Sequence, residues 1–114
     1  ESLKIAKDSK DLLGEAITLN NIGAIYRDQN NLKTALNYFE RALKIDEELG
    51  NLPEKAVVLS NIGTIHYAQG NYTDALKRYE EALKIDEQLG NLPGKAVVFT
   101  SIGLIYQGQG NYEE

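Results

Sequence analysis

Residues 11–50 read DLLGEAITLNNIGAIYRDQNNLKTALNYFERALKIDEELG, and residues 51–90 read NLPEKAVVLSNIGTIHYAQGNYTDALKRYEEALKIDEQLG. Aligned without a gap, the two segments are identical at 20 of 40 positions. A fixed period of this size indicates stacked structural repeats, each of which buries one face against its neighbours. We therefore predict one repeat domain over residues 1–114. It comprises the tail of a preceding second helix at 1–10, repeats at 11–50 and 51–90, and a truncated repeat at 91–114.

The apolar residues inside each repeat follow a helical spacing. They recur at i, i+3, i+4 and i+7, which is one face of a 3.6-residue period. The three copies of this packing stripe are Leu19, Ile22, Gly23 and Tyr26; Leu59, Ile62, Gly63 and His66; and Phe99, Ile102, Gly103 and Tyr106. A second stripe runs through Ala35, Leu36, Phe39, Ala42 and Leu43, and recurs 40 residues later. Each repeat is therefore predicted to form two antiparallel helices.

Residues that begin and end helices separate these stripes. Gly50 and its counterpart Gly90 suit the left-handed residue that follows a helix. Pro53 suits the first turn of the next helix, where a missing N–H costs nothing. Asn71 with Asp74 is predicted to form a capping box at the start of a second helix, as is Asn111 with Glu114. The links between helices are therefore expected to be short.

The combined pattern resembles the tetratricopeptide repeat, whose motif is large–x2–Leu–Gly–x2–Tyr, then Ala–x3–Phe–x2–Ala, then Pro. The first copy here reads Leu19, Ile22-Gly23, Tyr26, Ala35, Phe39 and Ala42, with Glu47 in place of the usual proline. The 40-residue period and the Asn before Ile-Gly are similar to the repeats of kinesin light chains and LGN-type adaptors. The resemblance implies an all-α, right-handed superhelical α-α solenoid that binds another protein.

The composition excludes several other classes of function. The 12 basic and 17 acidic residues give a net charge of −5, which argues against binding nucleic acid or an anionic membrane surface. There is no cysteine, and no apolar run approaches the ~20 residues that cross a bilayer. No leader pattern opens the chain, which begins at Glu1 as a fragment or processed piece would. We expect a cytoplasmic protein.

In the family that this chain resembles, the first helices of successive repeats line a concave surface. The helix face opposite the packing stripe is neutral and rich in amides and hydroxyls, and an amide can pair with the backbone of a ligand whatever its side chains. Asn21 and Asn61 are the strongest candidates, although a hydrogen bond to a neighbouring helix end would explain them equally well. The candidate partner-binding residues are Asn20, Asn21, Arg27, Ser60, Asn61, Thr64, Tyr67, Thr100, Ser101 and Gln107.

One binding mode of the family does not fit this chain. Members that bind chaperones hold a C-terminal carboxylate with a set of Lys, Asn and Arg side chains on three first helices. The matching positions here are Asn20, Ala24, Asn61, Val97 and Ser101, of which only Asn61 agrees. Without the cations, little would attract a carboxylate.

The sequence shows no catalytic or metal-binding pattern. His66 is the only histidine, and its place on the packing stripe predicts a buried or half-buried side chain. With no cysteine and no second histidine, a zinc site is not expected, and neither is any cofactor. The acidic run Asp46-Glu47-Glu48 is expected on a solvated helix face. We therefore predict that the chain is not an enzyme.

Two alternatives to an adaptor remain open at this point. In the first, the chain is a scaffold whose repeats stack head to tail between molecules, with residues 1–10 of one copy packing on the helix at 94–109 of another. In the second, the chain is a fragment of a larger enzyme or regulator, with the catalytic part elsewhere. Saturable binding by a monomer favours the adaptor, whereas association that depends on concentration favours the scaffold.

Overall fold

The computed structural model describes residues 9–108, and every regular element in that range is a helix. The helices are α2 (Ser9–Asp28), α3 (Leu32–Leu49), α4 (Leu52–Ala68), α5 (Tyr72–Leu89) and α6 (Leu92–Gly108). The prediction of an all-α fold is confirmed. The tail predicted before residue 9 and the capping box predicted at Asn111 lie outside the described residues.

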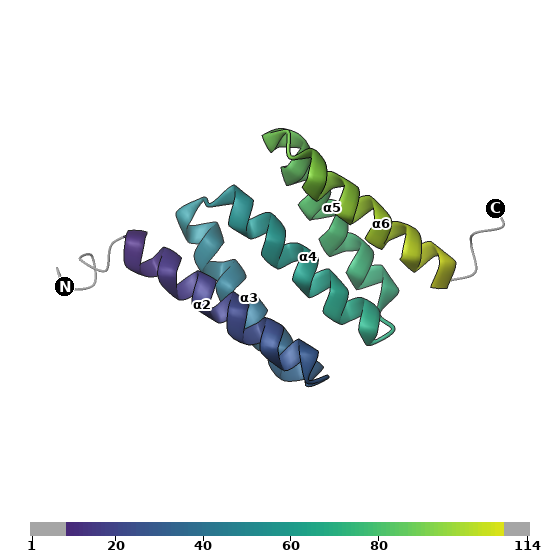
Figure 1. The fold of residues 1–114 in the computed structure, drawn as a ribbon, viewed down its shortest axis with the longest axis horizontal. Coiled ribbons are helices and arrows are strands. Elements are labelled where there is room, and N and C mark those ends of the chain that lie inside the picture. The colour runs from purple at the N-terminus through teal and green to yellow at the C-terminus, as the bar shows by residue number, and fades with distance from the viewer. Residues whose placement is uncertain (1–8, 109–114) are drawn as a thin grey trace.

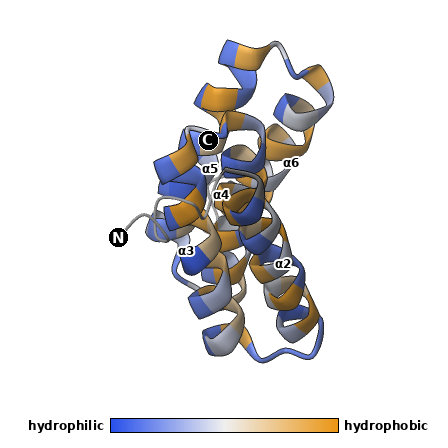
Figure 2. Cartoon of the chain, turned by 90° about the vertical axis from the view of Figure 1, so that its left-hand side faces the viewer, coloured by the Kyte–Doolittle hydropathy of each residue, from blue (hydrophilic) through white to orange (hydrophobic). Residues whose placement is uncertain are grey.

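The helices form two layers of an α-α solenoid (Figure 1). The helices α2, α4 and α6 run side by side in the nearer layer of that view, with α3 and α5 behind them. Contacts join α2 to α3 and α4 to α5 as helical hairpins, and α4 then contacts both α2 and α6. Figure 2 shows hydrophobic and hydrophilic residues together on each labelled helix, as expected of helices that bury one face.

The links between helices use left-handed residues, as predicted. Gly50 and Gly90 end α3 and α5 with φ of 67° and 69°. The N–H of Asn51 then donates to the carbonyl of Asp46 at 3.0 Å, which satisfies one of the free carbonyls at the end of α3. These short turns bring each second helix directly onto the next first helix.

The predicted capping box at Asn71 is wrong. Asn71 does precede α5, but its side chain makes no capping hydrogen bond and donates instead to Gln69 Oε1 at 3.4 Å. Side-chain caps occur instead at the links between a second helix and the next first helix. Asn51 Oδ1 accepts from the N–H of Glu54 at 3.4 Å, and Asn91 Oδ1 accepts from that of Gly94 at 3.1 Å. The asparagine before each first helix therefore does the capping.

Each complete hairpin is closed by an aromatic ring packed on a glycine. A Cβ added to Gly23 would lie 2.8 Å from the ring of Phe39, and one added to Gly63 would lie 2.9 Å from the ring of Tyr79. Both rings are almost fully buried. The glycines of the packing stripe therefore let the two helices of a hairpin approach closely.

Most of the third packing stripe is exposed, unlike its two copies, although Ile102 is half-buried against the core. Phe99 and Tyr106 on α6 are 54% and 43% exposed, and a Cβ added to Gly103 would meet nothing within 4 Å. The physical reason is that no second helix lies against this face among residues 9–108. His66, by contrast, is half-buried, as its place on the stripe predicted.

Gly63 and Gly103 allow a matched test of the packing. We predict that Gly63→Leu lowers the free energy of unfolding by about 1–3 kcal/mol, because the new side chain would overlap the ring of Tyr79. Gly103→Leu, at the same place in the next repeat, should raise it by up to about 1 kcal/mol, since leucine favours a helix over glycine. Urea denaturation of both variants measures the difference. Equal effects would contradict this account of the hairpin.

Candidate partner-binding surface

The ten candidate residues all lie on α2, α4 and α6, the helices of one layer (Figure 1). An apolar row runs across the same helices at a repeat of 40 residues. Ile17, Val57 and Val97 occupy equivalent positions, and they are 42%, 50% and 62% exposed. Apolar side chains held in register on three neighbouring helices form a surface that a partner can cover.

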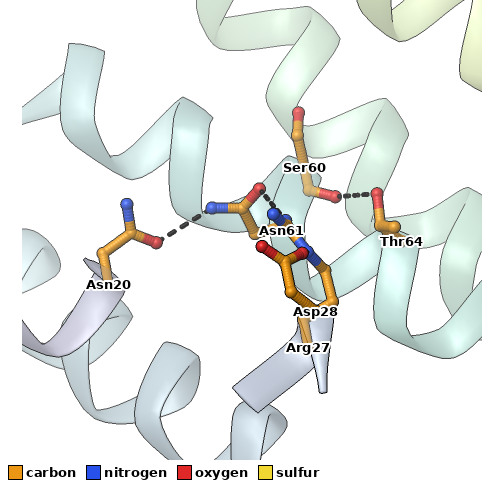
Figure 3. A network of polar contacts seen from close by, with 6 residues as sticks. All are labelled: Asn20, Arg27, Asp28, Ser60, Asn61 and Thr64. Carbon is orange, nitrogen blue, oxygen red and sulfur yellow. Dashed lines mark hydrogen bonds and ion pairs between the residues drawn. The ribbon is translucent and has the colours of Figure 1, made fainter. Parts of the chain in front are cut away.

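Three of the candidates form a hydrogen-bonded network between α2 and α4 (Figure 3). Asn61 Nδ2 donates to Asn20 Oδ1 at 2.9 Å, and Arg27 Nη1 donates to Asn61 Oδ1 at 3.4 Å. Arg27 also forms an ion pair with Asp28 at 3.4 Å. The orientation of the Asn61 amide is thus fixed from both of its ends, whereas Asn21 on the adjacent position is exposed.

Thr64 is held by a contact that the sequence did not predict. Its hydroxyl donates to the carbonyl of Ser60 at 3.0 Å and lies 2.8 Å from the phenol oxygen of Tyr79 on α5. Thr64 was expected only as a surface residue for a partner. The structure shows that it also links α4 to the aromatic ring that closes the second hairpin.

The remaining candidates are satisfied locally or exposed. Thr100 and Ser101 donate to carbonyls one turn earlier in α6, at 3.0 and 3.1 Å. The ring of Tyr67 lies 5.6 Å from that of Tyr72, and Gln107 is exposed. The structure therefore brings Asn20, Arg27 and Asn61 together, and it leaves the polar groups of α6 outside this network.

A cavity of about 250 Å³ opens between α4 and α6, next to the network. Its lining residues are Ala56, Val57, Ser60, Asn61, Asp86, Asn91, Gly94, Val97 and Val98. Sequence reasoning identified Ser60 and Asn61 but missed Asp86, Asn91 and Gly94. The available signal was a break in the repeat, because Gly94 stands where the preceding repeat has Glu54.

The expectation that Asp46 lies on a solvated face is wrong. Asp46 is fully buried, whereas its neighbours Glu47 and Glu48 are exposed as expected. Neither carboxyl oxygen of Asp46 has a hydrogen-bond partner, and the same is true of Oε2 of Glu54. Burial, with a further contribution from the charge of Glu54, raises the pKa of Asp46 to about 7. The first helix of the next repeat covers Asp46, which a single helix wheel does not show.

Asp86 occupies the same position one repeat later and is also buried. Burial raises its pKa, but the hydrogen bond that Asn91 Nδ2 donates to Asp86 Oδ1 at 3.4 Å acts in the opposite direction. The two junctions between repeats therefore differ. One holds two carboxyl groups close together, and the other holds a carboxyl group beside an amide and an open cavity.

Between residues 9 and 108, no three side chains of the metal-binding types lie close enough to hold an ion. No helix in that range has both the length and the apolar character that a membrane span requires.

Comparisons with known proteins agree with this architecture. A family model described as "Tetratricopeptide repeat" matches residues 1–48 and 54–114. The crystal structure of the TPR domain of Arabidopsis FLU is similar at a TM-score of 0.83 and 21% identity, over 88% of this chain and 84% of that one. BtubC (BKLC) from P. vanneervenii gives 0.80 and 23%, over 97% of this chain and 47% of that one. This chain thus spans about half the length of BtubC. At these identities the likeness shows the fold alone, and the comparison with curated proteins gave no match.

The buried carboxyl groups predict an unusual dependence of stability on pH. The pKa of Asp46 is higher in the fold than its ordinary value of 3.8, so the fold favours the neutral form. This contribution to stability is complete below about pH 3.8 and is lost as the pH rises to about 7. Asp46→Asn should therefore stabilise the protein above pH 7, by an amount on the order of 1–3 kcal/mol.

Urea denaturation between pH 5.5 and 8 measures this effect. The variant should show a flatter stability profile than the wild type over that range. Glu48→Gln, which changes an exposed neighbour, is the matched control and should follow the wild-type profile. Parallel profiles for Asp46→Asn and the wild type would contradict the prediction.

Proposed function

This chain belongs to the tetratricopeptide-repeat family, whose domains are generally protein–protein interaction modules, and we propose that it binds a peptide segment of a partner protein across α2, α4 and α6. The observation that supports this best is the pairing of two rows on one layer of helices. The apolar row of Ile17, Val57 and Val97 is exposed, and the amides of Asn20 and Asn61 lie beside it.

Such a surface suits an extended peptide. Apolar side chains of the peptide would cover the apolar row, while its backbone groups exchange hydrogen bonds with the asparagine amides. Asn21 is exposed and Asn61 is half-buried, so both remain accessible to a ligand. We propose a binding role without catalysis, and a partner that is a protein rather than a nucleic acid or a membrane.

Selection from a random peptide library on immobilised protein tests this function. The selected peptides should bind the wild type saturably. Asn21→Ala/Asn61→Ala should weaken binding by about 1–3 kcal/mol, since each lost hydrogen bond is worth about 0.5–1.5 kcal/mol. Fluorescence anisotropy gives the dissociation constants.

The matched control is Lys44→Ala/Lys84→Ala, which alters exposed side chains on the opposite layer, in α3 and α5. Its affinity should equal that of the wild type. Melting temperatures distinguish loss of binding from loss of the Asn20–Asn61 bond between helices. Peptides that bind the asparagine double variant as tightly as the wild type would argue against this surface.

A second candidate function is self-association, which the exposed stripe of α6 favours. Phe99 and Tyr106 are exposed on either side of Gly103. At the two equivalent glycines, Gly23 and Gly63, a ring of the second helix covers this face, whereas nothing in residues 9–108 covers Gly103. We propose that a helix of a second copy covers this stripe. The contact would be head to tail, and such contacts extend into filaments unless their rotation closes a ring.

Light scattering over a concentration series tests this association. The mean mass of the wild type should rise with concentration, and Phe99→Glu/Tyr106→Glu should keep the protein monomeric, because buried charges oppose the contact. Leu104→Glu is the control, because Leu104 is exposed on α6 but lies about 140° from Phe99 around the helix, away from the stripe. A wild type that stays monomeric throughout would eliminate this candidate.

A further inference from the structure

The residues that line the cavity between α4 and α6 differ in chemistry. Four of them are apolar, namely Ala56, Val57, Val97 and Val98. Asp86 contributes a carboxyl group, and this residue is only 3% exposed. Asn61, at the edge of the proposed peptide surface, lines the same cavity. The cavity thus connects the proposed peptide surface to a buried carboxyl group.

Three of the residues that line the cavity are smaller than their counterparts one repeat earlier: Val57 replaces Ile17, Ser60 replaces Asn20, and Gly94 replaces Glu54. The largest loss of side chain is at Gly94. Counting 40 residues back, the counterparts of Asp86 and Gly94 are Asp46 and Glu54. The Glu54 side chain is partly buried close to Asp46, whose pKa its charge raises. At Gly94, a Cβ would already lie 2.9 Å from Asp86 Oδ2. At the first junction, the carboxyl group of Glu54 therefore fills the space beside Asp46. At the second junction, the equivalent space beside Asp86 stays open.

The charge of Asp86 is poorly matched by the groups around it. Its one hydrogen bond that the structure shows from a side chain is long, at 3.4 Å, and comes from the neutral amide of Asn91. The N–H of Gly94 donates to Asn91 Oδ1 rather than to Asp86. The nearby Lys95 pairs with Glu87 at 3.5 Å. A buried carboxylate is stabilised by a paired cation, and none of these contacts supplies one to Asp86.

We propose that this cavity binds the side chain of a lysine or arginine of the partner peptide, with its aliphatic stem between the valines and its charged head at Asp86. The inference rests on the proposed function, and it identifies one side chain of the ligand. The cavity volume of about 250 Å³ is below the range of about 300–1,000 Å³ of sites for drug-sized ligands, so it suits a single side chain. Lysine and arginine bury their stems along apolar surface in this way.

The test compares peptides that differ only at the inserted side chain. Acetyl-Ala-Lys-Ala-amide and acetyl-Ala-Arg-Ala-amide are titrated against the isotope-labelled protein, with acetyl-Ala-norleucine-Ala-amide as the uncharged analogue. The backbone amide signals of Val57, Gly94 and Val97 should shift with the two cationic peptides. The norleucine peptide should bind about tenfold more weakly, because it lacks the charge-assisted hydrogen bond.

Two variants of the cavity sharpen the test. Asp86→Asn should remove the preference for the cationic peptides and leave norleucine binding unchanged. Gly94→Glu copies the residue of the first junction, and it should fill the cavity and abolish the shifts for all three peptides. Asp46→Asn, at the equivalent position of the closed junction, should leave every affinity as in the wild type. Dispersed spectra show that each variant is folded.

The outcomes separate this inference from the function on which it rests. Equal affinities for the lysine and norleucine peptides, an unchanged preference in Asp86→Asn, or no binding of any tripeptide would overturn the cationic pocket. Library peptides that still need Asn21 and Asn61 would then leave the proposed groove intact. If the tripeptides bind at Gly94 while the library yields no ligand for the asparagine surface, the pocket stands and the groove fails.

Discussion

The contact between a helix glycine and an aromatic ring underlies the architecture of both complete repeats. Gly23 meets Phe39 and Gly63 meets Tyr79 at distances that leave no room for a Cβ. Because each second helix is held this closely behind its first helix, α2 and α4 lie flush in one layer, and α6 continues that layer. The surface of amides and apolar side chains lies on this layer. The hydroxyl contact between Thr64 and Tyr79 links the surface directly to one of the two rings.

The hairpins and turns were predictable because their causes are local. Apolar residues three and four positions apart define a helix face, and a glycine after a helix adopts the left-handed conformation wherever the chain turns back. The cap predicted at Asn71 is absent, as it is at the equivalent Asn31, whereas Asn51 caps α4. The exposure of Phe99 and Tyr106 on α6 could be expected from the repeat pattern, because a second helix covers the earlier copies of the stripe and none follows α6 among residues 9–108.

The candidate surface was predicted in part, and the omissions share one physical origin. Asn61 and its neighbours follow from the helix face alone. The burial of Asp46 and the cavity at Asp86 depend instead on how the end of one repeat meets the start of the next. The two repeats share half of their residues, yet the replacement of Glu54 by Gly94, together with the smaller Val57 and Ser60, distinguishes the open junction from the closed one. An alignment of the repeats shows such differences, but only the structure shows which residues lie side by side at each junction.

The central helix α4 contacts every other helix of the described range, and neither α2 nor α3 contacts α5 or α6. Helix α4 therefore takes part in the network with α2, in the contact with the ring of Tyr79 and in the lining of the cavity. Every direct contact between helices at the two ends of the described range therefore runs through α4, so a substitution that weakens this helix is expected to loosen both junctions at once.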